Sequence, residues 1–180
     1  MIIPAILYIL GIVVGIVYFF SRQDDAVFYG GVTEYYLKIL DPCANPLSVL
    51  LTRIFVNAGY IVIVFVLSFV IFTYPLQLLI IIYRGAIIGV VGGVFFKAYG
   101  FYGGTVYLFV VLPQNIVVTF GLAIAGLLDF AHMIDRKNCG KPDVKVFAEN
   151  CIIGYCICFL GALYEFIVLL VMIRPLNFYF

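Results

Sequence analysis

Charged side chains are scarce in this sequence: they make up 11% of its 180 residues, whereas apolar residues make up 66%. An ordinary soluble domain carries about 25% charged and about 45–50% apolar residues. A chain of this length forms a single domain, and one domain cannot bury so large an apolar excess in a water-soluble core. We therefore expect most of the apolar surface to face the lipid bilayer.

Basic clusters, histidine and catalytic motifs are lacking as well. The net charge is +1 and Lys and Arg form no run, which argues against a nucleic-acid partner. With His132 as its single histidine, the chain cannot assemble a His-based metal cluster or triad. It also has neither a phosphate-binding loop nor a nucleophile elbow. The sequence thus predicts a protein that is not an enzyme, with no catalytic residue, no metal and no cofactor.

Long apolar segments, in contrast, follow one another along the chain. They predict an all-α membrane protein, a bundle of about five transmembrane helices in one polytopic domain over residues 1–180. The first segment lacks a basic n-region and a small-residue cleavage site, so we expect it to be retained as a span. The expected spans are residues 2–20, 60–73, 76–96, 103–128 and 151–173.

The two longest polar stretches are residues 21–58 and residues 129–150. Basic residues are denser in the second stretch, and the positive-inside rule therefore predicts that it is the cytoplasmic loop. With five spans, residues 21–58 become the external loop. Apolar residues recur at helical spacing between Leu47 and Phe55, which predicts either an interfacial helix or an extension of the second span.

Polar residues interrupt the predicted spans, among them Arg84, Gln114, Asn115 and Glu165. Arg84 lies about 12 Å into the third span at about 1.5 Å per residue, where a cation costs about 2.5–3.5 kcal/mol unless it is paired. We expect it to pair with Glu165, with Gln114 and Asn115 at a similar depth, so that one intramembrane polar cluster forms. Such a cluster can be a packing clamp or a transport or proton path.

Glycines and a proline mark the helix contacts. Gly85, Gly89 and Gly93 recur at intervals of four and clear one helix face, which allows close packing on another helix of the chain or on a second copy in a homo-oligomer. Pro113 removes an intrahelical hydrogen bond within the fourth span. It predicts a kinked fourth span or one broken into two half-helices.

The sequence resembles the stage II sporulation protein M family in three stretches: YRGAIIGVVGGVFF at residues 83–96, GFYG at residues 100–103 and VLPQN at residues 111–115. A basic residue before a glycine-spaced helix, an aromatic-glycine break and a Leu-Pro-Gln-Asn motif occur in that family in this order. FVNA at residues 55–58 is similar to the start of the family's second span, and five spans are similar in both.

The resemblance implies a non-enzymatic scaffold of sporulation in an endospore-forming bacterium. Its place would be the mother-cell membrane, at the septum and around the forespore. It would recruit and localise two peptidoglycan hydrolases, stage II sporulation proteins D and P, so that the wall is thinned during engulfment. Docking of such a partner is then expected on the external side, at Leu47, Leu50, Leu51, Ile54 and Phe55.

A function of a different class also fits the residues. In a small permease or transporter subunit, the cluster of Arg84, Gln114, Asn115 and Glu165 would line a mid-membrane path for a polar solute. A continuous cavity open to one side would distinguish this alternative from the scaffold.

Overall fold

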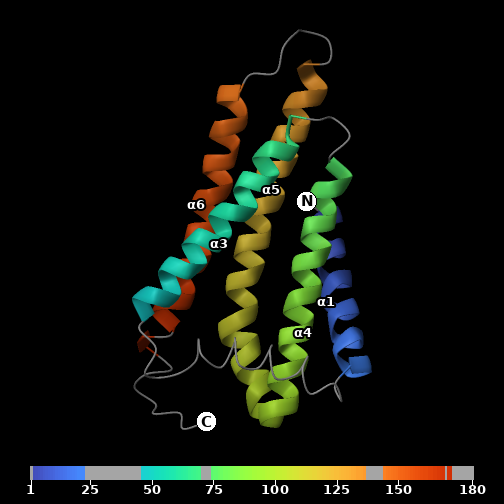
Figure 1. Cartoon of the computed structure of the whole chain (residues 1–180), viewed down its shortest axis with the longest axis vertical. Coiled ribbons are helices and arrows are strands. Elements are labelled where there is room, and N and C mark those ends of the chain that lie inside the picture. The colour runs from blue at the N-terminus through green and yellow to red at the C-terminus, as the bar shows by residue number, and fades with distance from the viewer. Residues whose placement is uncertain (1, 23–45, 70–73, 137–143, 169, 172–180) are drawn as a thin grey trace.

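The computed structural model describes residues 2–22, 46–69, 74–136, 144–168 and 170–171, and every regular element within them is a helix (Figure 1). The elements are α1 (Ile2–Arg22), α3 (Pro46–Leu67), α4 (Tyr74–Val106), the π-helical η2 (Tyr107–Val111), α5 (Leu112–Arg136) and α6 (Val144–Val168). Four stretches are long and apolar enough to cross a membrane: Ile2–Arg22, Leu47–Leu67, Pro75–His132 and Val144–Val168. These helices indicate a multi-pass membrane protein.

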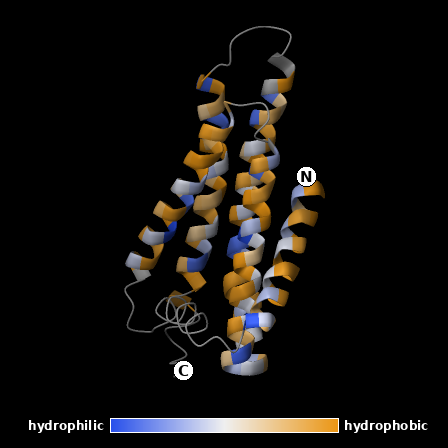
Figure 2. Cartoon of the chain, turned by 45° about the vertical axis from the view of Figure 1, so that its right-hand side comes forward, coloured by the Kyte–Doolittle hydropathy of each residue, from blue (hydrophilic) through white to orange (hydrophobic). Residues whose placement is uncertain are grey.

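Hydrophobic residues predominate along every helix, and hydrophilic residues are interspersed among them (Figure 2). Phe55 and Phe101, for example, are 73% and 87% exposed. The polar side chains buried inside are Asn57, Ser68, Gln77, Arg84, Gln114, Asn115, Thr119, Asp129 and Glu165. An apolar exterior around a partly polar interior suits a lipid solvent, which cannot hydrogen-bond to exposed polar groups.

The helices pack in a definite order. α1 lies on α4, α4 contacts α5 and η2, α5 lies on α6, and α3 packs mainly on α6. α1 and α4 run in the same direction side by side, whereas α5 returns antiparallel to α4 (Figure 1). α1 is therefore the edge helix of the bundle, and the polar interior lies among the other four helices.

The apolar stretch Pro75–His132 is 58 residues long. A straight helix of that length would measure about 87 Å, far more than the hydrocarbon core of about 30 Å. The stretch folds back at Gly100, whose φ of 59° and ψ of −140° are open to glycine but costly for other residues. Three residues later, a β-carbon at Gly103 would collide with the carbonyl oxygen of Phe95. Two glycines thus make the tight reversal.

The second apolar helix starts earlier than the sequence analysis expected. The span was expected at about residues 60–73 with a separate interfacial helix before it, yet α3 is continuous from Pro46 to Leu67. Residues 46–58 thus extend the span, the second of the two alternatives, and an interfacial helix there is wrong. The physical reason is that no proline or other helix-breaking turn lies between Phe55 and Tyr60.

The other expected boundaries differ less. α5 continues to Arg136 and α6 begins at Val144, so both helices extend into the stretch expected as a loop at residues 129–150. Most of the expected external loop, residues 23–45, lies outside the described residues, as do residues 70–73, 137–143 and 172–173.

Candidate functional site

Glu165 of α6 is the centre of the polar interior. Its carboxylate is 4% exposed and receives both Nε and Nη2 of Arg53, at 2.9 and 3.1 Å. The Nε2 atom of Gln114 donates to the same carboxylate at 2.7 Å. A two-point guanidinium–carboxylate pair fixes both distance and orientation. This contact therefore joins α3, α5 and α6.

Arg84 lies in the same interior without a carboxylate. Its Nη2 atom donates to Oδ1 of Asn115 at 3.3 Å, and its guanidinium carbon lies 4.7 Å from the centre of the Tyr60 ring. The predicted Arg84–Glu165 ion pair is wrong, because Glu165 is paired with Arg53. Arg84 is instead held by an amide and by the π face of a tyrosine, which attracts a cation.

The structure brings the four residues of the predicted cluster together through these bonds. Gln114 and Asn115 are neighbours on α5, and one bonds Glu165 while the other bonds Arg84. Nη1 of Arg84 and Oε1 of Gln114 are buried and have no hydrogen-bond partner among the described residues. Together with Arg53, the cluster contains two guanidinium groups and one carboxylate, and one donor and one acceptor in it lack a partner among the described residues.

The three glycines of α4 lie against α1. A β-carbon at Gly85 would collide with the carbonyl oxygen of Tyr8, one at Gly89 with that of Ile12, and one at Gly93 with the ring of Phe19. α1 contributes Gly11 and Gly15 to the same contact, where β-carbons would collide with the backbone of Ile82 and of Ala86. The glycine face is therefore used within the chain, in a parallel contact between two helix backbones.

Pro113 follows a π-helical turn instead of separating two half-helices. The backbone is π-helical over Tyr107–Val111 and α-helical from Leu112, whose N–H donates to the carbonyl of Tyr107. Proline has no N–H for the carbonyl of Phe109 four residues earlier. The Tyr164 hydroxyl of α6 donates to that carbonyl at 2.7 Å. α6 thus satisfies the backbone group that the proline leaves open.

A second polar cluster joins the opposite end of the helices. Asp129 of α5 is 1% exposed, and its carboxyl group contacts the hydroxyl of Ser68 and the Nδ2 atom of Asn150, the latter at 2.9 Å. The Cys151 thiol lies 3.8 Å from the carboxyl, and Nε2 of Gln77 lies 3.3 Å from the Ser68 hydroxyl. This cluster connects the end of α3 with α4, α5 and α6.

The residues expected to dock a partner lie near the start of α3. Leu47, Leu51 and Phe55 are 54%, 46% and 73% exposed, whereas Leu50 and Ile54 are partly buried. They form part of an apolar helix surface. Three of the five are therefore open to lipid or to a partner helix.

Two grooves lie beside α1. One, of about 430 Å³, lies between α1, α4 and η2 and is lined mainly by glycine and phenylalanine. The other, of about 310 Å³, lies between α1 and α5 and has Tyr8 and Thr119 among otherwise apolar residues. Neither groove is lined by Arg84, Gln114, Asn115 or Glu165. The polar cluster therefore does not open into them.

Sequence reasoning missed Arg53, because it assigned this residue to the external loop. The continuous apolar pattern of Leu47–Leu67 was the signal that places Arg53 within a membrane helix. It also missed Asp129, assigned to a loop, and the glycines of α1, although Gly11 and Gly15 have the same four-residue interval as those of α4.

The hydrogen bonds of the two polar clusters connect side chains of different helices, and this geometry is suited to holding those helices together. Among the described residues, no group of three His, Cys, Asp or Glu side chains could hold a metal ion. Some buried polar atoms, among them Nδ2 of Asn57, Nη1 of Arg84 and Oε1 of Gln114, have no hydrogen-bond partner among the described residues. A scan of protein-family models, a search of curated proteins and a search of solved structures give no match to this chain.

Proposed function

We propose that this protein is a non-enzymatic membrane scaffold of the sporulation engulfment machinery. It recruits stage II sporulation proteins D and P to the septum, where these peptidoglycan hydrolases thin the wall and let the mother-cell membrane engulf the forespore. The resemblance to the stage II sporulation protein M family carries this proposal.

The positions of the resembling residues support it. Arg84 is held in the polar interior, the following glycines pack on α1, Gly100 makes the reversal and Pro113 follows the π-helical turn. Several residues of the stretches that resemble the family thus take part in contacts between helices of this bundle. A scaffold needs such a fixed arrangement to present a partner surface.

The proposed topology has five crossings. Pro75–His132 crosses twice, down to Gly100 and back, and each of the other three apolar helices crosses once. The N-terminus and residues 137–143 then lie in the cytoplasm, and residues 23–45 lie outside. The start of α3, with Leu47, Leu51 and Phe55, lies at the external end, where a hydrolase with an external domain would dock.

Affinity capture from sporulating cells tests the scaffold. The wild-type protein, carrying an affinity tag, should recover both hydrolases. Replacing Leu47, Leu51 and Phe55 together by alanine should reduce that recovery at least about tenfold, the effect of losing about 1.4 kcal/mol.

The matched control replaces Val62, Ile63 and Val66, which are 59%, 48% and 60% exposed on the other half of α3. These changes remove a similar apolar surface from the same helix and should leave recovery unchanged. Equal losses in both variants would place docking elsewhere. Recovery of a permease ATPase with neither hydrolase would overturn the scaffold.

A permease or transporter subunit is the second candidate. The unused Nη1 of Arg84 and Oε1 of Gln114 favour it, because a polar solute or water could bind there. In that case, Arg84→Met and Gln114→Leu would abolish solute uptake into vesicles while both hydrolases failed to co-purify with the wild type.

A further inference from the structure

Asp129 is buried as deeply as Glu165, but in surroundings of a different kind. Neutral groups face it from every neighbouring element: Ser68 after α3, Gln77 in α4, and Asn150 and Cys151 in α6. Within its own helix, His132 is the nearest titratable group, and its ring packs edge-on against Phe147. Among the described side chains, no cationic nitrogen lies within 4.0 Å of the Asp129 carboxyl.

The hydroxyl of Ser68 has more contacts than it has hydrogen atoms. It lies 2.8 Å from the carbonyl oxygen of Val64 and also contacts Oδ2 of Asp129, while Nε2 of Gln77 donates to it at 3.3 Å. A hydroxyl has one hydrogen and two lone pairs. If its hydrogen goes to Val64, the contact with Asp129 needs a hydrogen on Oδ2. A proton on Asp129 therefore satisfies all three contacts at once.

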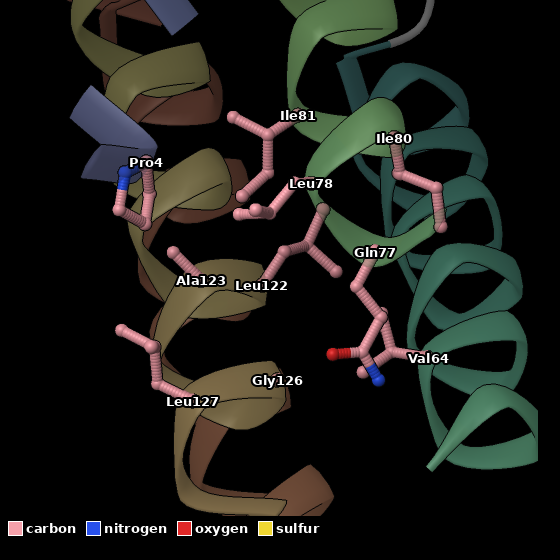
Figure 3. A pocket seen from close by; sticks show the side chains of 10 residues that line it. All are labelled: Pro4, Val64, Gln77, Leu78, Ile80, Ile81, Leu122, Ala123, Gly126 and Leu127. Atoms are coloured by element: carbon pink, nitrogen blue, oxygen red, sulfur yellow. The ribbon is translucent and has the colours of Figure 1, made fainter. Parts of the chain in front are cut away.

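Gly126 leaves room for the side-chain amide of Gln77, because it has no β-carbon. Figure 3 shows its amide nitrogen turned toward α3 and its oxygen turned toward Gly126, beside a cavity of about 10 Å³. A β-carbon at Gly126 would lie 2.8 Å from that oxygen. Among the described residues, the oxygen has no hydrogen-bond partner. If the amide were turned over, Ser68 would face a third acceptor, and the need for a proton would be greater.

Charge leads to the same assignment. A buried carboxylate without a cation costs far more free energy than a neutral carboxylic acid in the same place. The ion pair with Arg53 offsets this free-energy cost for Glu165. Asp129 has no such partner among the described residues. We propose that Asp129 is a proton-binding site, held in the folded protein as a neutral acid that donates from Oδ2 to Ser68.

Loss of this proton weakens the end of the bundle. When the proton passes from Oδ2 to a base in solution, a carboxylate is left, and the one hydrogen of Ser68 can then serve either Val64 or Asp129. The contact that ties the end of α3 and the start of α4 to α5 and α6 is weaker. Asp129 therefore makes the packing of these helices sensitive to pH.

Infrared spectroscopy of the full chain in alkyl maltoside micelles, whose detergent has no ester carbonyl, tests the protonation state. The wild type at neutral pH should show the carbonyl stretch of a protonated carboxylic acid, and Asp129→Asn should lose it. Glu149→Gln, at an exposed position, and Glu165→Gln, at the ion pair, should both keep it. Absence of the band in the wild type, or its survival in Asp129→Asn, would overturn the proposal.

Thermal unfolding gives a second readout. The folded protein keeps the proton, whereas an unfolded aspartate releases it near pH ~3.9. Stability is therefore greatest at low pH and falls as pH rises. From about pH 5 to about pH 9, the wild-type midpoint should fall by about 4 °C or more. An asparagine mimics the neutral acid, so Asp129→Asn should remove most of this fall; parallel curves would contradict the proposal. Neither readout depends on the hydrolase partners.

Discussion

Two of the contact regions that hold this bundle together, here called the glycine seam and the polar seam, use opposite chemistry. The glycine seam joins α1 to α4 through Gly11, Gly15, Gly85 and Gly89, where two backbones come into direct contact. The polar seam joins α3, α4, α5 and α6 through the bonds of Arg53, Arg84, Gln114, Asn115 and Glu165. In lipid, where apolar burial gives no net drive between helices, close packing and hydrogen bonds are the two remaining means of association.

The two seams differ in the kind of change that disrupts them. A glycine seam depends on shape, so any added carbon disturbs it, whereas charge and pH leave it unchanged. A polar seam depends on matched partners, so removing one partner is worse than removing both. The following variants test this distinction, beginning with the largest expected effect.

Breaking the ion pair should have the largest effect. Arg53→Met leaves Glu165 without its cation, and loss of one partner of a buried pair costs about 3–5 kcal/mol. Unfolding in mixed micelles with rising SDS measures the loss. The double variant Arg53→Met/Glu165→Met should recover most of it, whereas Lys145→Met, at an exposed 3.9 Å contact, should change little. A double variant as unstable as the single one would contradict the role given to charge.

Adding one carbon should break the glycine seam. Gly89→Ala places a β-carbon against the carbonyl oxygen of Ile12, and overpacking of this kind costs about 1–3 kcal/mol. Gly59→Ala is the control, because no atom lies within 4 Å of a β-carbon there. The same SDS titration should separate the two variants at every pH. Equal stabilities would mean that α1 and α4 do not meet as described.

The reversal at Gly100 is sensitive to the backbone alone. No atom would contact a β-carbon there, but φ is 59°. Gly100→Ala should therefore cost about 1–3 kcal/mol, because φ of 59° with ψ of −140° is a backbone conformation that is essentially open to glycine alone. Gly104→Ala, with its nearest atom at 3.6 Å, is a neighbouring control without this strain. If both variants unfold at the same SDS concentration, the backbone at Gly100 is not as described.

The smallest effect is expected at Tyr164. Tyr164→Phe removes the hydroxyl that donates to the carbonyl of Phe109, and hydrogen bonds between membrane helices contribute about 0.6 kcal/mol on average. Pro113→Ala restores a backbone donor to that carbonyl. Tyr164→Phe should therefore destabilise the wild type more than it destabilises Pro113→Ala, as measured by a double-mutant cycle of SDS titrations. If Tyr164→Phe destabilises both proteins equally, the hydroxyl of Tyr164 does not compensate for the backbone donor that Pro113 lacks.

Composition and spacing predicted the helical membrane fold, the glycine face and four of the five residues of the polar cluster, all except Arg53. These features are local: apolar run length, a four-residue interval and polar residues within apolar runs are all visible in one segment. Which side chains form hydrogen bonds and ion pairs with each other depends instead on segments far apart in the sequence. Glu165 pairs with a residue 112 positions away, and the choice between Arg53 and Arg84 depends on helix order and tilt.

The helix boundaries predicted from the sequence were wrong where polar residues occur within an apolar helix. The polar residues Ser48, Thr52 and Arg53 favoured an interfacial helix before the second span, although Arg53 is largely covered by other helices once the bundle forms. Asp129 was placed in a loop for the same reason. A polar residue near a span end can belong to water or to a neighbouring helix, and a single sequence does not distinguish these environments.

The order of helices in the bundle has a consequence for biogenesis. α1 is synthesised first, yet the helix it packs on, α4, begins at Tyr74, after all of α3. Until α4 has been made, α1 can lie in the bilayer without a partner helix, because residues 2–20 carry no charged side chain. Arg53 in α3 needs a later helix, because the carboxylate that pairs with it belongs to Glu165, near the end of α6, which is the last of the described helices in chain order. The polar seam is therefore completed only after α6 has been made.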